Sequence, residues 1–196
     1  MKAVLERREV VASLLQDRKN LLVVAGLGST AWDITAAGDA PLNFPLWGGM
    51  GNAAMIGLGL ALAQPRRRVL VITGDGEMLM GLGSLATIGV QKPRNLALVV
   101  IDNERYGETG MQATHTAAGV DLAAVAKACG FRSARQVRSR AQLGSLRAAA
   151  HALPGPVFAQ VKVIAQKIPL VLPPRDGGLL KARFRRALLG EGADTE

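Results

Sequence analysis

The stretch VLVITGDGEMLMGLGSLATIGVQKPRNLALVVIDN, residues 69–103, decides the fold. It opens with the apolar run 69–73, passes through a Gly-Asp-Gly turn, continues as a helical segment over 82–90 and ends in a second apolar run, 96–101. Two continuous apolar runs that are joined through a helix are typical of parallel strands buried on both faces of a sheet. The stretch therefore predicts one strand-helix-strand unit of a parallel α/β sheet.

The same alternation continues on both sides of this unit. We expect further strands at residues 21–25 and 157–164, further helices at 4–16, 30–37, 52–63, 122–128 and 141–152, and a loop over 43–49. This order predicts an α/β fold with a doubly wound, mostly parallel sheet flanked by helices. Residues 1–166 are expected to form one α/β domain, and residues 167–196 a C-terminal extension with a short basic helix near 179–189.

Length and composition narrow the class of protein. The chain has 196 residues, of which 49% are hydrophobic and 20% charged, which suits a single packed domain and excludes a disordered chain. Its single cysteine, Cys129, excludes an intrachain disulfide and a cysteine-rich metal site. No apolar run approaches the roughly 20 residues of a membrane span, and the N-terminus lacks the pattern of a signal peptide. We therefore expect a cytoplasmic protein with no membrane contact.

The charge of the chain is strongly basic and unevenly spread. The formal net charge is +9, and residues 122–175 hold nine Lys or Arg side chains and no Asp or Glu. Nucleic acid is not the expected partner, because the chain lacks DNA-binding motifs and has only 4% aromatic residues for stacking on bases. The basic residues could have three roles: they form a solvated basic face, a surface that docks an acidic partner, or a field that attracts an anionic substrate.

Polar side chains follow the two strands of the opening stretch. Asp75 lies between Gly74 and Gly76 after the first strand, and Asn103 follows the second. Because ligands of a doubly wound sheet bind beyond the carboxyl ends of its strands, we expect the Asp75 and Asn103 side chains to face one site. Carboxylate and amide oxygens suit Mg²⁺, with diphosphate oxygens and water completing its ligands. A Gly-Asp-Gly tight turn without a ligand is the alternative.

The spacing of these residues resembles the cofactor motif of thiamine diphosphate enzymes, whose cofactor is also called thiamine pyrophosphate. In this motif a Gly-Asp-Gly turn is followed, after some 25 residues, by Asn; here 26 residues separate Gly76 from Asn103. The resemblance implies that Mg²⁺ is held by the side chains of Asp75 and Asn103 and by the backbone carbonyl of Arg105. It also implies the thiamine diphosphate-binding fold, specifically its diphosphate-binding domain.

A second segment, LWGGMGNAAMIGLGLALA at residues 46–63, resembles the family's approach to a glycine-rich helix. Met50 lies 25 positions before Asp75, at the place of the apolar residue that supports the bent cofactor, and the Gly48 carbonyl matches the acceptor for its aminopyrimidine. The loop after the first strand resembles the one that contacts the diphosphate. The cofactor-binding residues implied in this way are Gly28, Ser29, Thr30, Gly48, Gly49, Met50, Gly74, Asp75, Gly76, Glu77, Asn103, Arg105, Tyr106 and Gly107.

Nearly the whole chain resembles in particular the small separate subunits of sulfopyruvate and phosphonopyruvate decarboxylases. One departure is Glu77, because these decarboxylases usually have a small hydroxyl residue at that place. A carboxylate there repels a phosphate unless it turns away from it. The resemblance implies a lyase that removes CO₂ from a small anionic 2-oxo acid and releases an aldehyde.

The family's catalysis needs two domains, and this chain resembles only the one that holds diphosphate and metal. The other supplies a Glu to the pyrimidine ring of the cofactor, and the only Glu residues before the motif here are Glu6 and Glu9, on the first expected helix. We therefore expect a pyrimidine-binding (alpha) partner subunit that carries the catalytic Glu, with the active site formed between chains of a hetero-oligomer.

His115, in the loop after Asn103, is the one local acid-base candidate, with a surface or hinge histidine as the alternative. Two further functions stay open. One is another thiamine enzyme, either a carboligase of the acetolactate synthase type or a 2-oxo acid oxidoreductase. The other is a non-enzymatic nucleotide-binding module that only shares the Gly-Asp-Gly turn.

Overall fold

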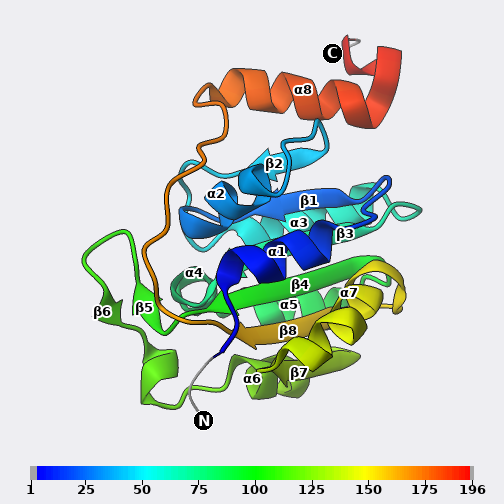
Figure 1. Cartoon of the computed structure of the whole chain (residues 1–196). Helices are drawn as coiled ribbons and strands as arrows, with labels where there is room; N and C mark the ends of the chain where they lie inside the picture. Colours follow the sequence, from blue (N-terminus) through cyan, green and yellow to red (C-terminus); the bar gives the residue numbers. More distant parts are fainter. Residues whose placement is uncertain (1–3, 195–196) are drawn as a thin grey trace.

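The computed structural model of the chain describes residues 4–194. Its centre is a six-stranded sheet in the order β2-β1-β3-β4-β8-β7, in which all neighbouring strands are parallel (Figure 1). The strands are β1 (Leu22–Ala25), β2 (Asn43–Pro45), β3 (Val69–Gly74), β4 (Leu96–Asp102), β7 (Ser133–Val137) and β8 (Val157–Lys162). β3 and β4 are the two apolar runs of the opening stretch, and they pair from Val69 with Leu96 to Gly74 with Ile101. The predicted parallel α/β sheet is therefore confirmed.

Helices cover both faces of the sheet, as predicted for a doubly wound fold. They are α1 (Arg7–Leu15), α2 (Ser29–Ala36), α3 (Ala53–Ala63), α4 (Asp75–Met80), α5 (Ser84–Gln91), α6 (Leu122–Ala128), α7 (Leu143–Ala152) and α8 (Gly177–Leu189). Helices α1, α2 and α7 lie on one face of the sheet, and α3, α5 and α6 lie on the other (Figure 1). No helix within residues 4–194 is long and apolar enough to cross a bilayer.

The connections open a crevice between β1 and β3. From β1 the chain passes through α2, on one face, to the edge strand β2, and it returns through α3, on the opposite face, to β3. The loops that follow β1 and β3 therefore leave the sheet in opposite directions. In open α/β sheets such a switch point is the usual place for a ligand.

Three elements differ from the sequence prediction. Residues 43–49 were expected as a loop, but Asn43–Pro45 forms the edge strand β2, and Ser133–Val137 forms the edge strand β7. Both are short, and β7 (SARQV) is only partly buried, so neither carries the continuous apolar pattern of a central strand. Helix α4 begins at Asp75 itself, so the Gly-Asp-Gly motif opens a helix directly.

The segment after β8 crosses the carboxyl-end side of the sheet to reach α8, beside β2 (Figure 1, orange). Arg8 donates to the carbonyl of Pro169 at 2.8 Å, and the Trp47 indole donates to the carbonyl of Pro174 at 2.7 Å. Helix α8 packs through Phe184 on Phe44, with ring centroids 5.4 Å apart. The expected basic helix is thus present, and the boundary at residue 166 stays a prediction.

Candidate cofactor-binding site

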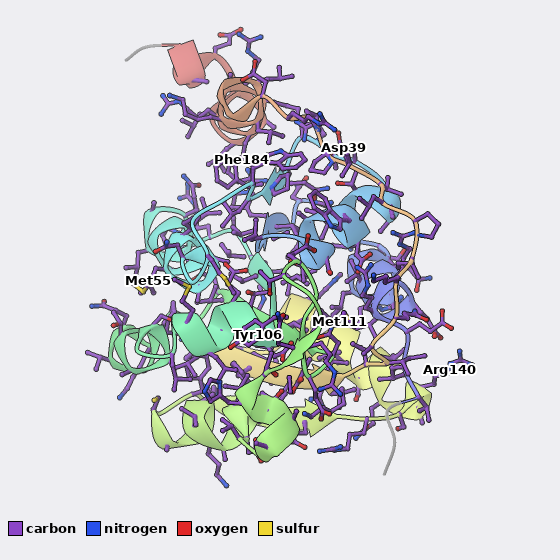
Figure 2. All side chains as sticks on the ribbon, turned by 90° about the vertical axis from the view of Figure 1, so that its left-hand side faces the viewer. Asp39, Met55, Tyr106, Met111, Arg140 and Phe184 are labelled. Atoms are coloured by element: carbon purple, nitrogen blue, oxygen red, sulfur yellow. The ribbon has the colours of Figure 1, made fainter. Side chains whose placement is uncertain are left out.

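The segments that follow β1, β3 and β4 line one cleft at the carboxyl edge of the sheet. A two-stranded hairpin, β5 (Arg105–Tyr106) and β6 (Gln112–Ala113), rises over it after β4. Figure 2 looks onto this side, with Tyr106 and Met111 of the hairpin near its centre. The cleft is lined by Arg7, Leu27, Ser29, Thr30, Met50, Gly74, Asp75, Gly76, Glu77, Ile101, Asn103, Arg105, Tyr106, Gly107, Glu108 and Thr109.

Eleven of the fourteen predicted cofactor-binding residues are in this lining. They come from four separate parts of the chain, which only the fold brings together. The other three, Gly28, Gly48 and Gly49, are not among the lining residues. His115 is exposed and also lies outside the lining, so the structure does not place it with the other candidates.

Asp75 is a buried carboxylate at the start of α4, only 2% exposed. Its Oδ2 accepts from the hydroxyl of Thr114 at 2.5 Å and from that of Thr116 at 3.3 Å. Burial, together with the nearby charge of Asp102, raises the pKa of Asp75 to about 6. A carboxylate in such a place is costly when ionised and is stabilised by a cation.

Asn103 lies in the same lining, in a turn that begins where β4 ends. Its Oδ1 accepts from the backbone N–H of Arg105 at 2.9 Å, which fixes the path of the chain between the two residues. The described residues contain no cluster of three or more His, Cys, Asp or Glu side chains that could hold a metal ion. A cation here therefore needs oxygens from a ligand or from water besides those of Asp75, Asn103 and the Arg105 carbonyl.

Behind these residues lies a buried polar network centred on Asp102. Its carboxylate accepts from Thr116 at 2.8 Å and from Gln160 at 2.6 Å, and it pairs with Lys162 at 2.7 Å. Lys162 also contacts Glu104 at 2.8 Å. Burial by itself lowers the pKa of Lys162, but the bonds to Asp102 and Glu104 outweigh it and raise that pKa. Sequence reasoning missed this network, although the position of Asp102 next to Asn103 was a signal for it.

Glu77 lines the cleft and ties three segments together. Its Oε2 accepts from the hydroxyl of Thr73 at 2.9 Å and from the N–H of Leu27 at 3.1 Å, and its Oε1 lies 3.4 Å from the N–H of Ala53. Burial raises its pKa. A Cβ added to Gly26 would lie 1.8 Å from Oε2, so a larger residue here would displace this carboxylate where it crosses the β1 turn.

Glycines allow the hairpin to close on the cleft. A Cβ on Gly76 would lie 2.5 Å from the ring of Tyr106, and a Cβ on Gly28 would lie 2.8 Å from the carboxylate of Glu108. Gly28 also has φ +77°, a conformation that favours glycine, directly before the first turn of α2. Residues from the first turns of α2 and α4, namely Ser29, Thr30 and Asp75, line the cleft, and the start of a helix is a setting that suits a phosphate.

Arg7 is a lining residue that the sequence analysis did not single out. Its guanidinium is 5% exposed, pairs with Asp33 at 2.6 Å and donates to the carbonyl of Ser29 at 3.0 Å. Arg8 adds a second contact to Asp33 at 3.2 Å. Burial raises the pKa of Asp33 and the two arginines oppose that effect. The cluster holds α1 against the turn that begins α2.

Comparisons with known proteins find relatives that match most of this chain. The family described as "Thiamine pyrophosphate enzyme, C-terminal TPP binding domain" matches residues 28–161. Sulfopyruvate decarboxylase subunit beta of Methanothermobacter thermautotrophicus is 42% identical over 159 residues, which cover 81% of this chain and 82% of that one. Phosphonopyruvate decarboxylase of Streptomyces viridochromogenes is 41% identical over 161 residues, and there the match covers 82% of this chain and 39% of the relative.

Among solved structures, benzoylformate decarboxylase from Polynucleobacter necessarius superposes with a TM-score of 0.69 at 21% identity. The match covers 85% of this chain and 34% of that one. At this identity the likeness supports the fold alone. The chain thus spans about a third to two-fifths of these larger relatives, and most of the separate beta subunit.

Proposed function

The chain belongs to the thiamine pyrophosphate enzymes, as their C-terminal TPP-binding domain, and from this premise we propose that it is the diphosphate-binding subunit of a two-chain 2-oxo acid decarboxylase. The substrate class follows from the relatives named sulfopyruvate and phosphonopyruvate decarboxylase. Each of those names describes a 2-oxo acid with a second acidic group. The reaction releases CO₂ and an aldehyde.

The main support for this proposal is that one cleft is lined by Asp75, Asn103, Arg105 and Met50. The three oxygen donors are of the hard type that Mg²⁺ prefers, and they are too few to saturate it, which leaves places for diphosphate oxygens. The N–H groups at the starts of α2 and α4 suit the rest of the diphosphate. The residues present therefore fit Mg²⁺ and thiamine diphosphate.

When bound, thiamine diphosphate supplies the electron sink that lets a 2-oxo acid lose CO₂. This chain's part is to bind and orient it. Asp75, Asn103 and the Arg105 carbonyl hold Mg²⁺, the first turn of α2 at Ser29 and Thr30 holds the diphosphate, and Met50 supports the body of the cofactor. Glu77 holds the β1, β3 and α3 segments together through its three contacts rather than touching phosphate.

The proton chemistry at the pyrimidine ring is assigned to a partner subunit. Glu6 is exposed, Glu9 pairs with Arg140 at 3.1 Å, and Glu77 is engaged with Thr73, Leu27 and Ala53. Glu104 pairs with Lys162 at 2.8 Å, and Glu108 lies against Gly28, at the end of the cleft that is assigned to the diphosphate and not to the pyrimidine. The name "subunit beta" of the archaeal relative supports a separate alpha subunit. We therefore place the catalytic Glu on that partner and the active site between the two chains.

The test is calorimetric titration with thiamine diphosphate and MgCl₂, of this chain alone and of this chain copurified with its partner subunit. Tight binding only in the complex, and its loss in Asp75→Ala, are expected. Asp17→Ala is the matched control, because Asp17 is 77% exposed and lies 3.8 Å from Arg147, outside the cleft. Absence of binding with and without the partner would contradict the proposal.

Product analysis with a panel of 2-oxo acids separates the decarboxylase from the other thiamine reactions. Aldehyde and CO₂ in equal amounts support it. A longer hydroxyketone would indicate a carboligase, and turnover that needs an electron acceptor would indicate an oxidoreductase. Rapid decarboxylation by this chain alone would contradict the two-chain arrangement.

A further inference from the structure

Two threonine hydroxyls converge on one oxygen of Asp75. Thr114 donates to Oδ2 at 2.5 Å, and Thr116 lies 3.3 Å from the same atom. The two hydroxyls are 2.9 Å apart, and their side chains are 2% and 4% exposed. Both residues follow β6, and the intervening His115 is exposed to solvent. In this Thr-His-Thr segment, the two hydroxyls thus face the carboxylate of Asp75, and the imidazole faces solvent.

Thr116 also ties this pair to the sheet. Its hydroxyl is 2.8 Å from Oδ1 of Asp102, the last residue of β4. Asp102 is itself held by the amide of Gln160, by the ammonium of Lys162 and by the backbone N–H of Glu104 at 3.0 Å. The orientation of the Asp75 carboxylate is therefore set through Thr116 by two central strands, β4 and β8, rather than by a mobile loop.

This arrangement distinguishes the two oxygens of Asp75. Both hydroxyls contact Oδ2, and Asp75 itself lines the cleft together with Asn103. Thr114 gives its one proton to Oδ2, whereas Thr116 shares its one proton between Oδ1 of Asp102 at 2.8 Å and Oδ2 of Asp75 at 3.3 Å. The hydroxyl of Thr116 therefore links the two carboxylates and orients that of Asp75. Removing a hydrogen bond of this kind from a carboxylate that binds a metal typically lowers the metal affinity or the activity by about 10- to 100-fold.

We propose that Thr114 and Thr116 are positioning residues that turn Oδ2 of Asp75 into the protein and leave Oδ1 as the oxygen that binds Mg²⁺. The inference rests on the proposed function, because it concerns the same site. It adds two residues that act on the cation through Asp75 and gives the Asp102–Lys162 pair a role as their anchor.

The deciding variant is Thr116→Val in the complex of this chain with its partner. It leaves Thr114 bonded to Asp75, and Asp102 keeps Gln160, Lys162 and the N–H of Glu104, so the fold is expected to survive. The quantity measured by calorimetry is the MgCl₂ concentration at which thiamine diphosphate binding is half-maximal. We expect it to rise about 10- to 100-fold, and Thr114→Val to act in the same direction.

Rescue separates positioning from packing. Thr116→Ser keeps the hydroxyl but lacks the methyl group, and we expect it to have the wild-type Mg²⁺ requirement. If Thr116→Ser needs as much Mg²⁺ as Thr116→Val, packing of the methyl group is the cause and the inference is wrong. Thr35→Val is the matched control, since the hydroxyl of Thr35 donates to the carbonyl of Ala31 within α2, at 2.9 Å, and Thr35 is not among the residues that line the cleft. It should leave the Mg²⁺ requirement unchanged.

The remaining outcomes are also decisive. If Thr116→Val binds the cofactor at the wild-type Mg²⁺ concentration, the inference is wrong while the proposed function stands. If the wild-type complex binds no thiamine diphosphate at any Mg²⁺ concentration, the proposed function is wrong, and the inference falls with it. Should Thr114→Val fail to assemble, Thr116→Val and its serine counterpart decide by themselves.

Discussion

The raised pKa of Asp75 makes the stability of the protein depend on pH. Burial and Asp102 raise its pKa from 3.8 to about 6, so the folded chain holds this proton more tightly than the unfolded chain does. A raised carboxyl pKa stabilises the fold fully below about pH 4, and this contribution is lost as pH rises through 6. At about 1.4 kcal/mol per pKa unit, the ionised group costs about 3 kcal/mol at pH 7.5.

Asp75→Asn should therefore stabilise the chain in the absence of metal and cofactor. We expect the free energy of unfolding to rise by about 1–3 kcal/mol at pH 7.5, and by about 1 kcal/mol less at pH 5, where the wild-type carboxyl is largely protonated. Urea unfolding at both pH values measures the effect. A stabilisation that is equal at pH 5 and pH 7.5, or any destabilisation at pH 7.5, would show that the raised pKa of Asp75 is not its cause.

Glu77 is expected to be a structural link between the β1 turn, β3 and α3. Glu77→Ser removes the acceptor of Leu27 and Ala53 and should lower the free energy of unfolding by about 1–3 kcal/mol. Glu191→Ser, at an exposed glutamate, is the control. Gly26→Ala should destabilise the wild type, because its Cβ meets Oε2, but cost less when it is combined with Glu77→Ser. Equal costs in the two backgrounds would contradict the link.

At the scale of elements, α3 lies on β3 because a glycine faces the sheet. A Cβ on Gly57 would lie 2.1 Å from Cγ2 of Val71, whereas a Cβ on Gly59, in the same helix, meets nothing within 4 Å. Gly57→Ala should thus destabilise the protein by about 1–3 kcal/mol through overpacking. Gly59→Ala should stabilise it by about 0.5–1 kcal/mol, because alanine favours the helix. Thermal unfolding of the two variants measures both changes in stability. If both variants are stabilised, or both destabilised, packing against Val71 does not explain the need for glycine at position 57.

What the sequence could predict was local in the chain. The stretch 69–103 carries two central strands and two metal-ligand candidates at fixed spacing, so the parallel sheet and the β3–β4 side of the cleft could be inferred from it. Ser29, Thr30 and Met50 were predicted from the resemblance of two other segments. Thr114 and Thr116 could not, because they lie in an irregular segment that only the folded chain brings to Asp75. His115 was expected near the site because it lies in the loop after Asn103, but its side chain is exposed, and it is its neighbours Thr114 and Thr116 that contact Asp75.

At the scale of the whole molecule, charge bears on how an anion reaches the cleft. The chain carries a formal net charge of +9, and some of its basic side chains are paired, such as Arg140 with Glu9 and Lys162 with Asp102. The remaining excess attracts anions over a distance of about 10 Å at 0.1 M salt and about 3 Å at 1 M. A field of this kind raises the rate of encounter with an oppositely charged substrate, and it raises that rate more for a dianion than for a monoanion.

The active complex should accordingly lose kcat/KM as salt rises, and lose more for a 2-oxo acid with a second acidic group than for pyruvate. The physical reason is that screening removes more attraction from a dianion than from a monoanion, while binding contacts inside the cleft, which are partly buried, are screened less. Steady-state rates between about 0.05 and 0.5 M NaCl, over which the screening length falls severalfold, measure this loss. Pyruvate is the internal control for any general effect of salt on the enzyme. Parallel slopes for the two substrates would mean that the basic surface is merely solvated or is covered by the partner subunit, and that the substrate's second acidic group is recognised only after it has entered the cleft.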